Sequence, residues 1–232
     1  MFIVIKKNMI IAVLLILVVM FSFATIVKTK SKTVAQVSDK TVVIDAGHGG
    51  ADGGCVGVDG VLEKDINLSL SKKVKSVFEE NGYKVIMTRE TDTDLSDKDK
   101  KTIKSQKNSD LKNRAKLVNN SNCSLFISIH MNQYTSPEIF GAQVFYNSND
   151  AKSEQYAKSV MECLKKIDDK NKRLAKNIPN KNLVFSNINV AGILVECGFL
   201  SNPDECKKLQ NEEYQKKIAN AIYDGVKKCE TK

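Results

Sequence analysis

The stretch Val42-Val43-Ile44-Asp45-Ala46-Gly47-His48-Gly49-Gly50 leads from an apolar run directly into a glycine-rich turn. A short apolar run that ends at glycines is typical of a buried strand, and glycine adopts backbone conformations that other residues resist. The turn therefore displays His48 at the carboxyl end of the predicted strand. The second of the two histidines, His130, also ends an apolar run, which predicts that two strands deliver their histidines to one shared site.

Strands and helices are predicted to alternate along the chain. Apolar runs predict strands at residues 41–46, 84–88, 124–129, 142–146, 183–185 and 192–195. Helical spacing of apolar residues predicts helices at 63–81, from a cap at Ser109, at 151–167 and at 212–228, and charge predicts an exposed loop at 91–108. This alternation predicts an α/β fold: a single domain with a mostly parallel central sheet flanked by helices on both faces.

An uncharged apolar segment, residues 9–27, stands near the start of the chain. It matches the roughly 20 apolar residues that cross a bilayer as a helix, and Lys6 and Lys7 before it predict that everything after it lies outside the cytoplasm. Small residues at Ser22 and Ala24 also suit a signal peptidase, so an anchored and a secreted form both stay open. We expect an N-terminal transmembrane anchor or signal segment at 1–27, a linker at 28–40 and an extracytoplasmic domain at 41–232.

The formal net charge of +9 is concentrated at the start of the chain. Residues 1–32 hold five lysines and no acid, which leaves 31 basic against 27 acidic residues for the domain. Nucleic-acid binders cluster basic and aromatic residues, and no such module is present, so we expect no nucleic-acid partner. The six cysteines form no C-x-x-C pair and predict mostly free or buried thiols, with one disulfide as the alternative.

Two histidines and one carboxylate would suit a catalytic zinc ion, which takes three protein ligands and leaves a fourth position for water. The carboxylates at strand ends or helix starts are Asp45, Asp52, Glu63 and Glu196. Each also has a structural explanation, because Glu63 suits a helix amino terminus and Asp45 suits the turn. The residues alone therefore leave a metal site and structural roles both open.

Six short motifs resemble those of the zinc-dependent N-acetylmuramoyl-L-alanine amidases of the Amidase_3 type. They are VVIDAGHGG at 42–50, LEKD at 62–65, TR at 88–89, residues 111–119 around Arg114, SIHMN at 128–132 and VECGFLSN at 195–202. The resemblance spans about residues 41–228. The single-domain, lysine-rich form with its apolar N-terminal segment is further similar to the sporulation members of this family, which act on spore-cortex peptidoglycan.

The resemblance implies a site and a reaction. His48, Glu63 and His130 would bind zinc, and Glu196 would be the catalytic acid and base. The domain at 41–232 would hydrolyse the amide bond between N-acetylmuramic acid and L-alanine in peptidoglycan. Another zinc hydrolase of the wall, an endopeptidase or carboxypeptidase, and a non-catalytic wall-binding module are the alternatives.

The chain departs from the common form of this family in two places. The segment between Arg89 and Arg114 is longer than usual and charged, and no wall-binding repeat is present. Affinity for the wall must then come from the catalytic groove, from the membrane segment or from a partner. We therefore expect a second exported protein that docks on the domain and helps to assemble the site. We also expect Arg173 to contact carboxylates of the substrate, and the alternative is that Arg173 is an ordinary surface arginine.

Overall fold

One sheet organises the part of the chain that this computed structural model describes, residues 40–147, 150–178 and 182–231. Its strands are β1 (Thr41–Ala46), β2 (Lys84–Met87), β3 (Leu125–Asn132), β4 (Gln143–Tyr146), β5 (Lys176–Asn177) and β6 (Gly192–Phe199). Their spatial order is β2-β1-β3-β6-β4-β5. Neighbouring strands are parallel except β4 and β6, so the predicted α/β domain has a mixed sheet.

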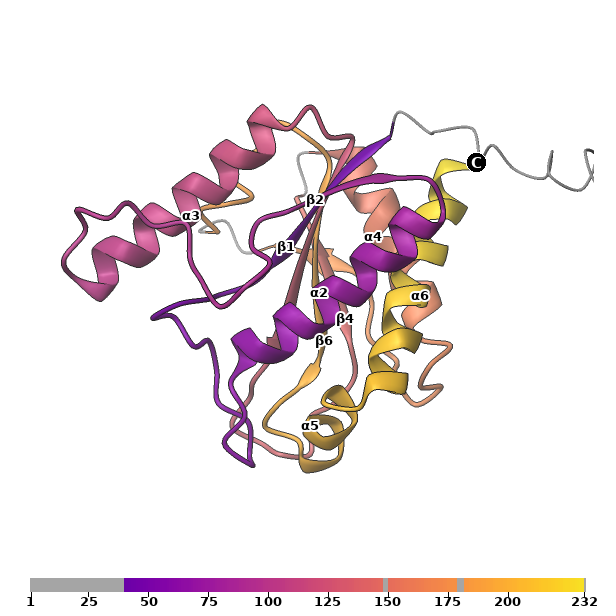
Figure 1. Cartoon of the computed structure of the whole chain (residues 1–232). Coiled ribbons are helices and arrows are strands. Elements are labelled where there is room, and N and C mark those ends of the chain that lie inside the picture. The colour runs from indigo at the N-terminus through magenta and orange to yellow at the C-terminus, as the bar shows by residue number, and fades with distance from the viewer. Residues whose placement is uncertain (1–39, 148–149, 179–181, 232) are drawn as a thin grey trace, which may run out of the picture. The chain divides into compact units, whose positions relative to one another are not determined.

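Helices cover both faces of this sheet, as predicted (Figure 1). One face is covered by α2 (Glu63–Glu80), α4 (Ala151–Leu164) and α6 (Glu212–Glu230), and the other by α3 (Ile103–Asn120). Side chains of a strand point alternately to its two faces. Accordingly, Val42 and Ile44 of β1 join the core beneath α2, α4 and α6, whereas Val43 packs with Ala115 and Val118 of α3.

The helices on the first face are packed closely. The short helix α5 (Pro203–Leu209) follows β6 and precedes α6. Where α6 crosses α4, a Cβ atom added at Gly225 would lie 2.4 Å from the Cα of Val160, so only glycine allows this approach. At the end of α6, Glu230 accepts hydrogen bonds from Lys40, Tyr83 and Tyr156, which ties this helix to the amino edge of the sheet.

Two local predictions are wrong. The predicted loop at 91–108 ends early, because α3 begins at Ile103 rather than after Ser109, with Thr102 and Ser105 forming a reciprocal capping box. The predicted strand at 183–185 consists of turns, and its apolar side chains Val184 and Phe185 instead pack on the α3 side of the sheet. The helix α5 is additional to the predicted elements.

Other expectations concern the termini, the cysteines and the surface. No helix in the described ranges combines the length and apolar character needed to cross a membrane, and the predicted segment at 1–27 and nearly all of the linker lie outside those ranges.

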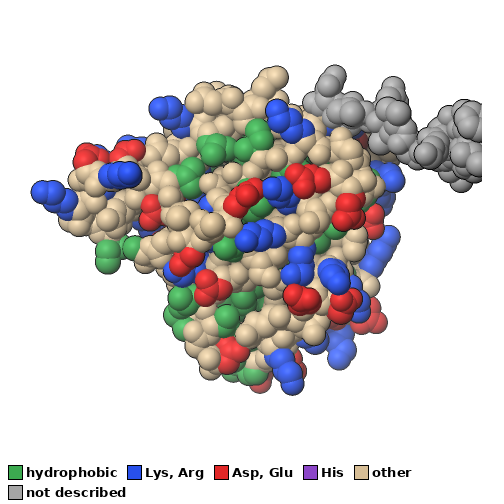
Figure 2. Space-filling view, in the orientation of Figure 1, with side chains coloured by type: hydrophobic (Ala, Val, Ile, Leu, Met, Phe, Trp, Pro, Cys, Tyr) green, Lys and Arg blue, Asp and Glu red, His purple; other side chains and the backbone are tan. Residues whose placement is uncertain are grey.

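Cys55, Cys123, Cys163, Cys197 and Cys206 are free thiols, in agreement with the prediction. Basic and acidic side chains are interspersed on the face shown in Figure 2.

Candidate active site

The four predicted site residues come together at the carboxyl end of the central strands. His48 follows β1, His130 lies in β3 and Glu196 lies in β6, while Glu63 is the first residue of α2. Strand β3 pairs with both β1 and β6, and His130 stands directly opposite Glu196 in the register. The register shifts between His130 and Asn132, a type of irregularity that redirects side chains near active sites.

The buried carboxylate of Glu63 joins the two histidines. Its Oε1 atom lies 3.0 Å from Nδ1 of His130, and its Oε2 atom lies 3.1 Å from Nε2 of His48. The ligand atoms of these three residues all lie within 4.8 Å of one another, an arrangement that could hold a metal ion. Burial raises the pKa of Glu63, but the two imidazoles outweigh burial and hold this pKa below its usual range.

Further hydrogen bonds fix the Glu63 side chain. The backbone amides of Cys55 and Met131 donate to it at 2.9 Å and 3.1 Å, and Asn67, one turn further along α2, donates at 3.2 Å. A carboxylate held by three donors as well as two imidazoles has little freedom to turn. The first residue of α2 is thus preorganised to face both histidines.

The glycine turn lets the two imidazoles approach each other. A Cβ atom added at Gly47 would lie 2.3 Å from the ring of His130, so a larger residue there would displace that ring. His48 itself has a φ of 61°, a left-handed conformation that costs a non-glycine residue about 1–3 kcal/mol and is often found at functional sites. The pKa of His48 is raised to about 9, because the carboxylates of Asp52 and Glu63 outweigh the burial that lowers it.

A buried charge network supports the turn from below. Arg114 of α3 pairs with Asp45 and with Asp110 and donates to the carbonyl oxygens of Ala46 at 2.9 Å and of His48 at 2.7 Å. Burial raises the pKa of Asp45, but Arg114, with smaller contributions from neighbouring side chains, holds it at about 2. Asp45 therefore supports the turn and is not a member of the metal-binding group.

Glu196 differs from the other carboxylates because one of its oxygens lacks a partner. Its Oε2 atom is buried and accepts no hydrogen bond from the described residues. Burial, with a further contribution from the charge of Glu63, raises its pKa to about 7, although His130 and His48 oppose the shift. An unpartnered buried carboxylate with a pKa near neutrality is suited to accept and return a proton.

A cavity of about 380 Å³ opens over this group. Its lining includes His48, His130 and Glu196, residues Lys107, Leu111 and Arg114 of α3, and residues 182–185. The turns that replaced the predicted strand at 183–185 thus border the site.

The sequence of this chain matches known amidases. A family model described as N-acetylmuramoyl-L-alanine amidase matches residues 42–228. The chain belongs to the N-acetylmuramoyl-L-alanine amidase family. This amidase is 42% identical over 190 residues to the germination-specific N-acetylmuramoyl-L-alanine amidase of Bacillus subtilis, a match that covers 82% of this chain and 79% of the relative.

Solved structures of other amidases share the fold. The CwlD amidase of Clostridioides difficile, solved in complex with the GerS lipoprotein, superposes on this amidase with a TM-score of 0.79. It is 42% identical, and the match covers 83% of this chain and 98% of that chain. A further N-acetylmuramoyl-L-alanine amidase from Clostridium difficile 630 gives a TM-score of 0.71 at 31% identity, over 82% and 97% of the two chains. The chain is therefore a peptidoglycan amidase that cleaves between N-acetylmuramic acid and L-alanine.

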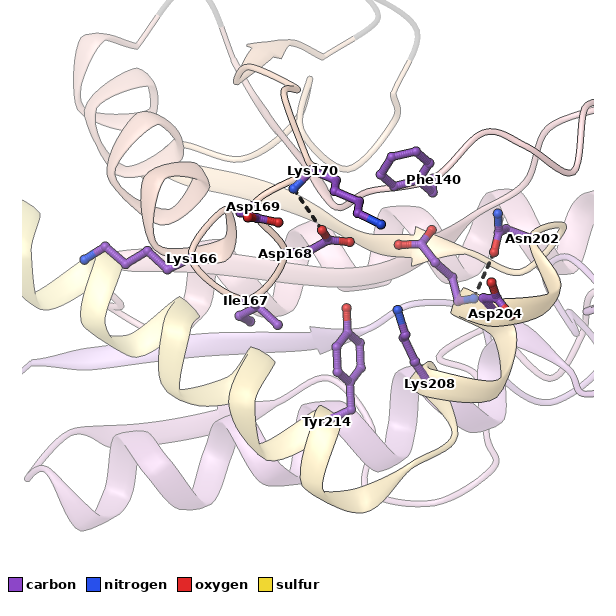
Figure 3. Close-up of a pocket in the computed structure, with 11 residues that line it drawn as sticks. Phe140, Lys166, Ile167, Asp168, Asp169, Lys170, Asn202, Asp204, Lys208 and Tyr214 are labelled. Carbon is purple, nitrogen blue, oxygen red and sulfur yellow. Dashed lines mark hydrogen bonds between the residues drawn. The ribbon is translucent and has the colours of Figure 1, made fainter.

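A second cavity of the amidase, of about 610 Å³, lies away from this chemistry (Figure 3). Lys208 and Tyr214 extend into it from α5 and α6, and residues 166–170 after α4 line its other side. None of the described residues that line it belongs to the His48, Glu63 and His130 group or is Glu196. Among the described residues, its lining includes no histidine.

Some residues around the amidase site escaped prediction, and one was misplaced. Lys107 and Asn67 were not predicted as site residues, although Asn67 stands at helical spacing from Glu63. Arg173 is not among the described lining residues of the catalytic cavity. Its guanidinium instead donates to Phe140 and Gln143.

Proposed function

We propose that this amidase holds a zinc ion with His48, Glu63 and His130 and moves protons with Glu196. The observation that carries the proposal is the convergence of two imidazoles on one buried carboxylate, beside the unpartnered Oε2 atom of Glu196. Two histidines with one glutamate form a donor set found in catalytic zinc sites, and three ligands leave a position open for water. The residues present therefore fit the metal that is typical of this family.

Residues of this chain would transfer the protons of the reaction and orient the substrate. When bound, zinc lowers the pKa of water to about 7 and polarises the scissile carbonyl. Glu196 would accept a proton from the attacking water and return it to the leaving nitrogen of L-alanine, which is a poor leaving group without that proton. The cavity between α3 and residues 182–185 would orient the glycopeptide over Glu196.

The bond that this amidase cleaves is checked by the mass of the products released from purified cortex and vegetative wall. An amidase releases complete stem peptides that begin with the free amine of L-alanine. Stems shortened at an internal peptide bond would instead identify an endopeptidase or carboxypeptidase. Unchanged wall would favour a non-catalytic binding module.

Replacing either histidine by alanine is expected to remove the metal. In His48→Ala and His130→Ala one of only three ligands is lost, so zinc content should fall from about one ion per chain to a small fraction of that. Elemental analysis after dialysis measures this. Lys158→Met, which changes an exposed residue of α4, is the control and should retain full zinc; full occupancy in either histidine variant would refute the ligand assignment.

The biological setting proposed for this amidase is the spore wall. The relative from Bacillus subtilis is named for germination, and the CwlD amidase has the same identity to this chain. We therefore place its substrate in spore-cortex peptidoglycan. Comparison of muropeptides from spores with and without this protein tests the placement, and identical cortex in the two would contradict it.

We also propose that the domain acts outside the cytoplasm, anchored in the membrane by the segment at 1–27 or secreted after its cleavage. The first described residue, Lys40, lies at the amino edge of the sheet, whereas His48 and Glu196 lie at the carboxyl end. Fractionation and N-terminal sequencing distinguish the forms, and a cytoplasmic pool alone would contradict both.

An exported accessory protein is the remaining part of the proposal. The CwlD amidase of Clostridioides difficile was solved with a lipoprotein bound, and the present domain carries no wall-binding repeat. A partner of this kind would dock on the domain and help to assemble the metal site. Full zinc occupancy and full wall cleavage by the isolated protein would count against it.

A further inference from the structure

The imidazole of His48 has a second carboxylate partner, on the side away from Glu63. The Oδ2 atom of Asp52 lies 2.9 Å from Nδ1 of His48, and the same oxygen lies 3.0 Å from Nζ of Lys107. Lys107 belongs to α3, whereas Asp52 belongs to the glycine turn after β1. A chain of three groups thus runs from the surface of α3 to the metal-binding group.

We infer that Asp52 and Lys107 form a positioning pair that orients the His48 imidazole for metal binding, an inference that rests on the proposed metal site. A neutral imidazole carries one N–H and one lone pair. If Asp52 accepts the Nδ1–H, the lone pair stands on Nε2, the atom that faces Glu63 at 3.1 Å. Carboxylates in this outer position fix the tautomer and the ring direction of metal-binding histidines.

His48 needs such support because its backbone is unusual. Its φ of 61° is followed by positive φ values at Gly49 and Gly50, which have no side chains that could contact the ring. Asp52 is itself held in place, because Gly49 and Asp52 exchange two backbone hydrogen bonds of 2.9 Å and 3.0 Å. The turn therefore brings the Asp52 carboxylate back to Nδ1.

Helix α3 supports both the backbone and the side chain of His48. Arg114 donates to the backbone carbonyl of His48 at 2.7 Å, and Lys107, two helical turns earlier, reaches Asp52. Residues seven apart share one face of a helix, so one face of α3 contacts the His48 backbone directly and the His48 imidazole through Asp52.

The early start of α3 is what supplies Lys107. The first turns of the helix lie in the charged segment between Arg89 and Arg114, and they are held by hydrogen bonds with residues outside the helix. Ser109 donates to Asp97 at 2.7 Å, and the amide of Leu95 donates to Asp110 at 2.7 Å. The charged segment thus gains a role in presenting Lys107 to the site.

If Asp52 and Lys107 had a purely structural role, their loss would lower the stability of the metal-free fold. The Lys107 side chain is 47% exposed, and partly exposed ion pairs contribute little to folding stability. Loss of the pair should therefore leave the metal-free fold intact and act on metal affinity.

Cobalt(II) binding to the purified full-length chain, stripped of metal, tests the inference through the visible absorption of the bound ion. Asp52→Asn keeps an oxygen for the amide of Gly54 but cannot accept the imidazole proton with a full charge, and should weaken cobalt affinity about 10–100-fold. Lys107→Met should weaken it several-fold, and Lys107→Arg should restore it. Lys112→Met, at an exposed site of the same helix, is the matched control and should bind as the wild type does.

The outcomes separate this inference from the proposed function. Wild-type affinity in Asp52→Asn, or equal affinity in Lys107→Met and Lys112→Met, overturns the positioning pair and leaves the metal site standing. A higher KM in Lys107→Met with unchanged cobalt affinity also overturns it, because Lys107 would then be a substrate contact. If the wild-type chain does not bind cobalt, both the positioning pair and the proposed metal site are overturned. If the metal-free variants have a lowered Tm, the pair has only a structural role.

Discussion

Glu196→Gln is expected to stop wall cleavage while zinc content stays at the wild-type level. The glutamine has nearly the same shape but cannot take a proton from water or return it to the leaving nitrogen. General acid and base catalysis typically contributes about 10²–10⁴-fold to a rate, and one residue here would do both parts. Release of stem peptides should therefore fall by at least about 10²-fold, measured by mass spectrometry against time.

The same variant tests the consequence of burying the Oε2 atom of Glu196. Burial raises its pKa to about 7, so the carboxylate is near the point where it both accepts and gives up a proton at neutral pH. A bound cation would lower that pKa, so cleavage by the wild type should decline only as the pH falls below 7. Glu138→Gln, at an exposed glutamate, is the control. Wild-type turnover in Glu196→Gln would refute its role, and loss of zinc in that variant would make it a ligand instead.

Predictions from local sequence were accurate where the signal lies within one element. The strand at 41–46 and the helix that begins at Glu63 were predicted to within a residue, because apolar spacing and the glycine turn mark them. The start of α3 was missed for a physical reason. Its first turn after Thr102 contains one apolar residue, Ile103, and that side chain is exposed. Its capping box uses Ser105 rather than Glu or Gln, and burial begins only at Ser109.

Apolar composition alone cannot tell a buried strand from a buried turn. Phe185 lies 5.3 Å from the ring of Phe126, so its segment is as apolar as a strand without pairing as one. The opposite error concerns α5, which is too short for a helical period. Its Asn202 cap and Pro203 at the first helical position were readable signals that the apolar pattern did not use.

In the candidate site, too, residues marked by a local signal could be predicted, and contacts between distant elements could not. His48, Glu63, His130 and Glu196 could be predicted because strand ends, a helix start and family motifs all mark them. The support from Lys107 to Asp52 could not, because it depends on how α3 lies across the turn. Asp45 and Arg114 were visible as motif residues, but only the packed structure shows that they form a buried pair.

Arg114→Met is expected to destabilise the domain by about 3–5 kcal/mol, the cost of leaving a buried charge without its partner. Arg114 is 1% exposed, and its loss would leave both Asp45 and Asp110 uncompensated. Chemical denaturation measures the free energy of unfolding. Lys216→Met removes the cation of an exposed pair on α6 and, as the control, should leave that free energy nearly unchanged.

The pH dependence of this variant gives a sharper test than its magnitude. In the wild type the pKa of Asp45 is lowered from 3.8 to about 2, so its contribution is complete above about pH 4 and is lost as the pH falls through 2. Without Arg114 the largest opposition to burial is lost, so that pKa should rise, and the fall in unfolding free energy at low pH should shrink or reverse. Should Arg114→Met fail to fold, the double variant with Asp45→Asn removes the more deeply buried of the two unpaired charges and should recover folded protein. Equal stability of Arg114→Met and the wild type at neutral pH, or parallel pH profiles, would show that the Asp45 and Arg114 pair does not hold the turn that carries His48.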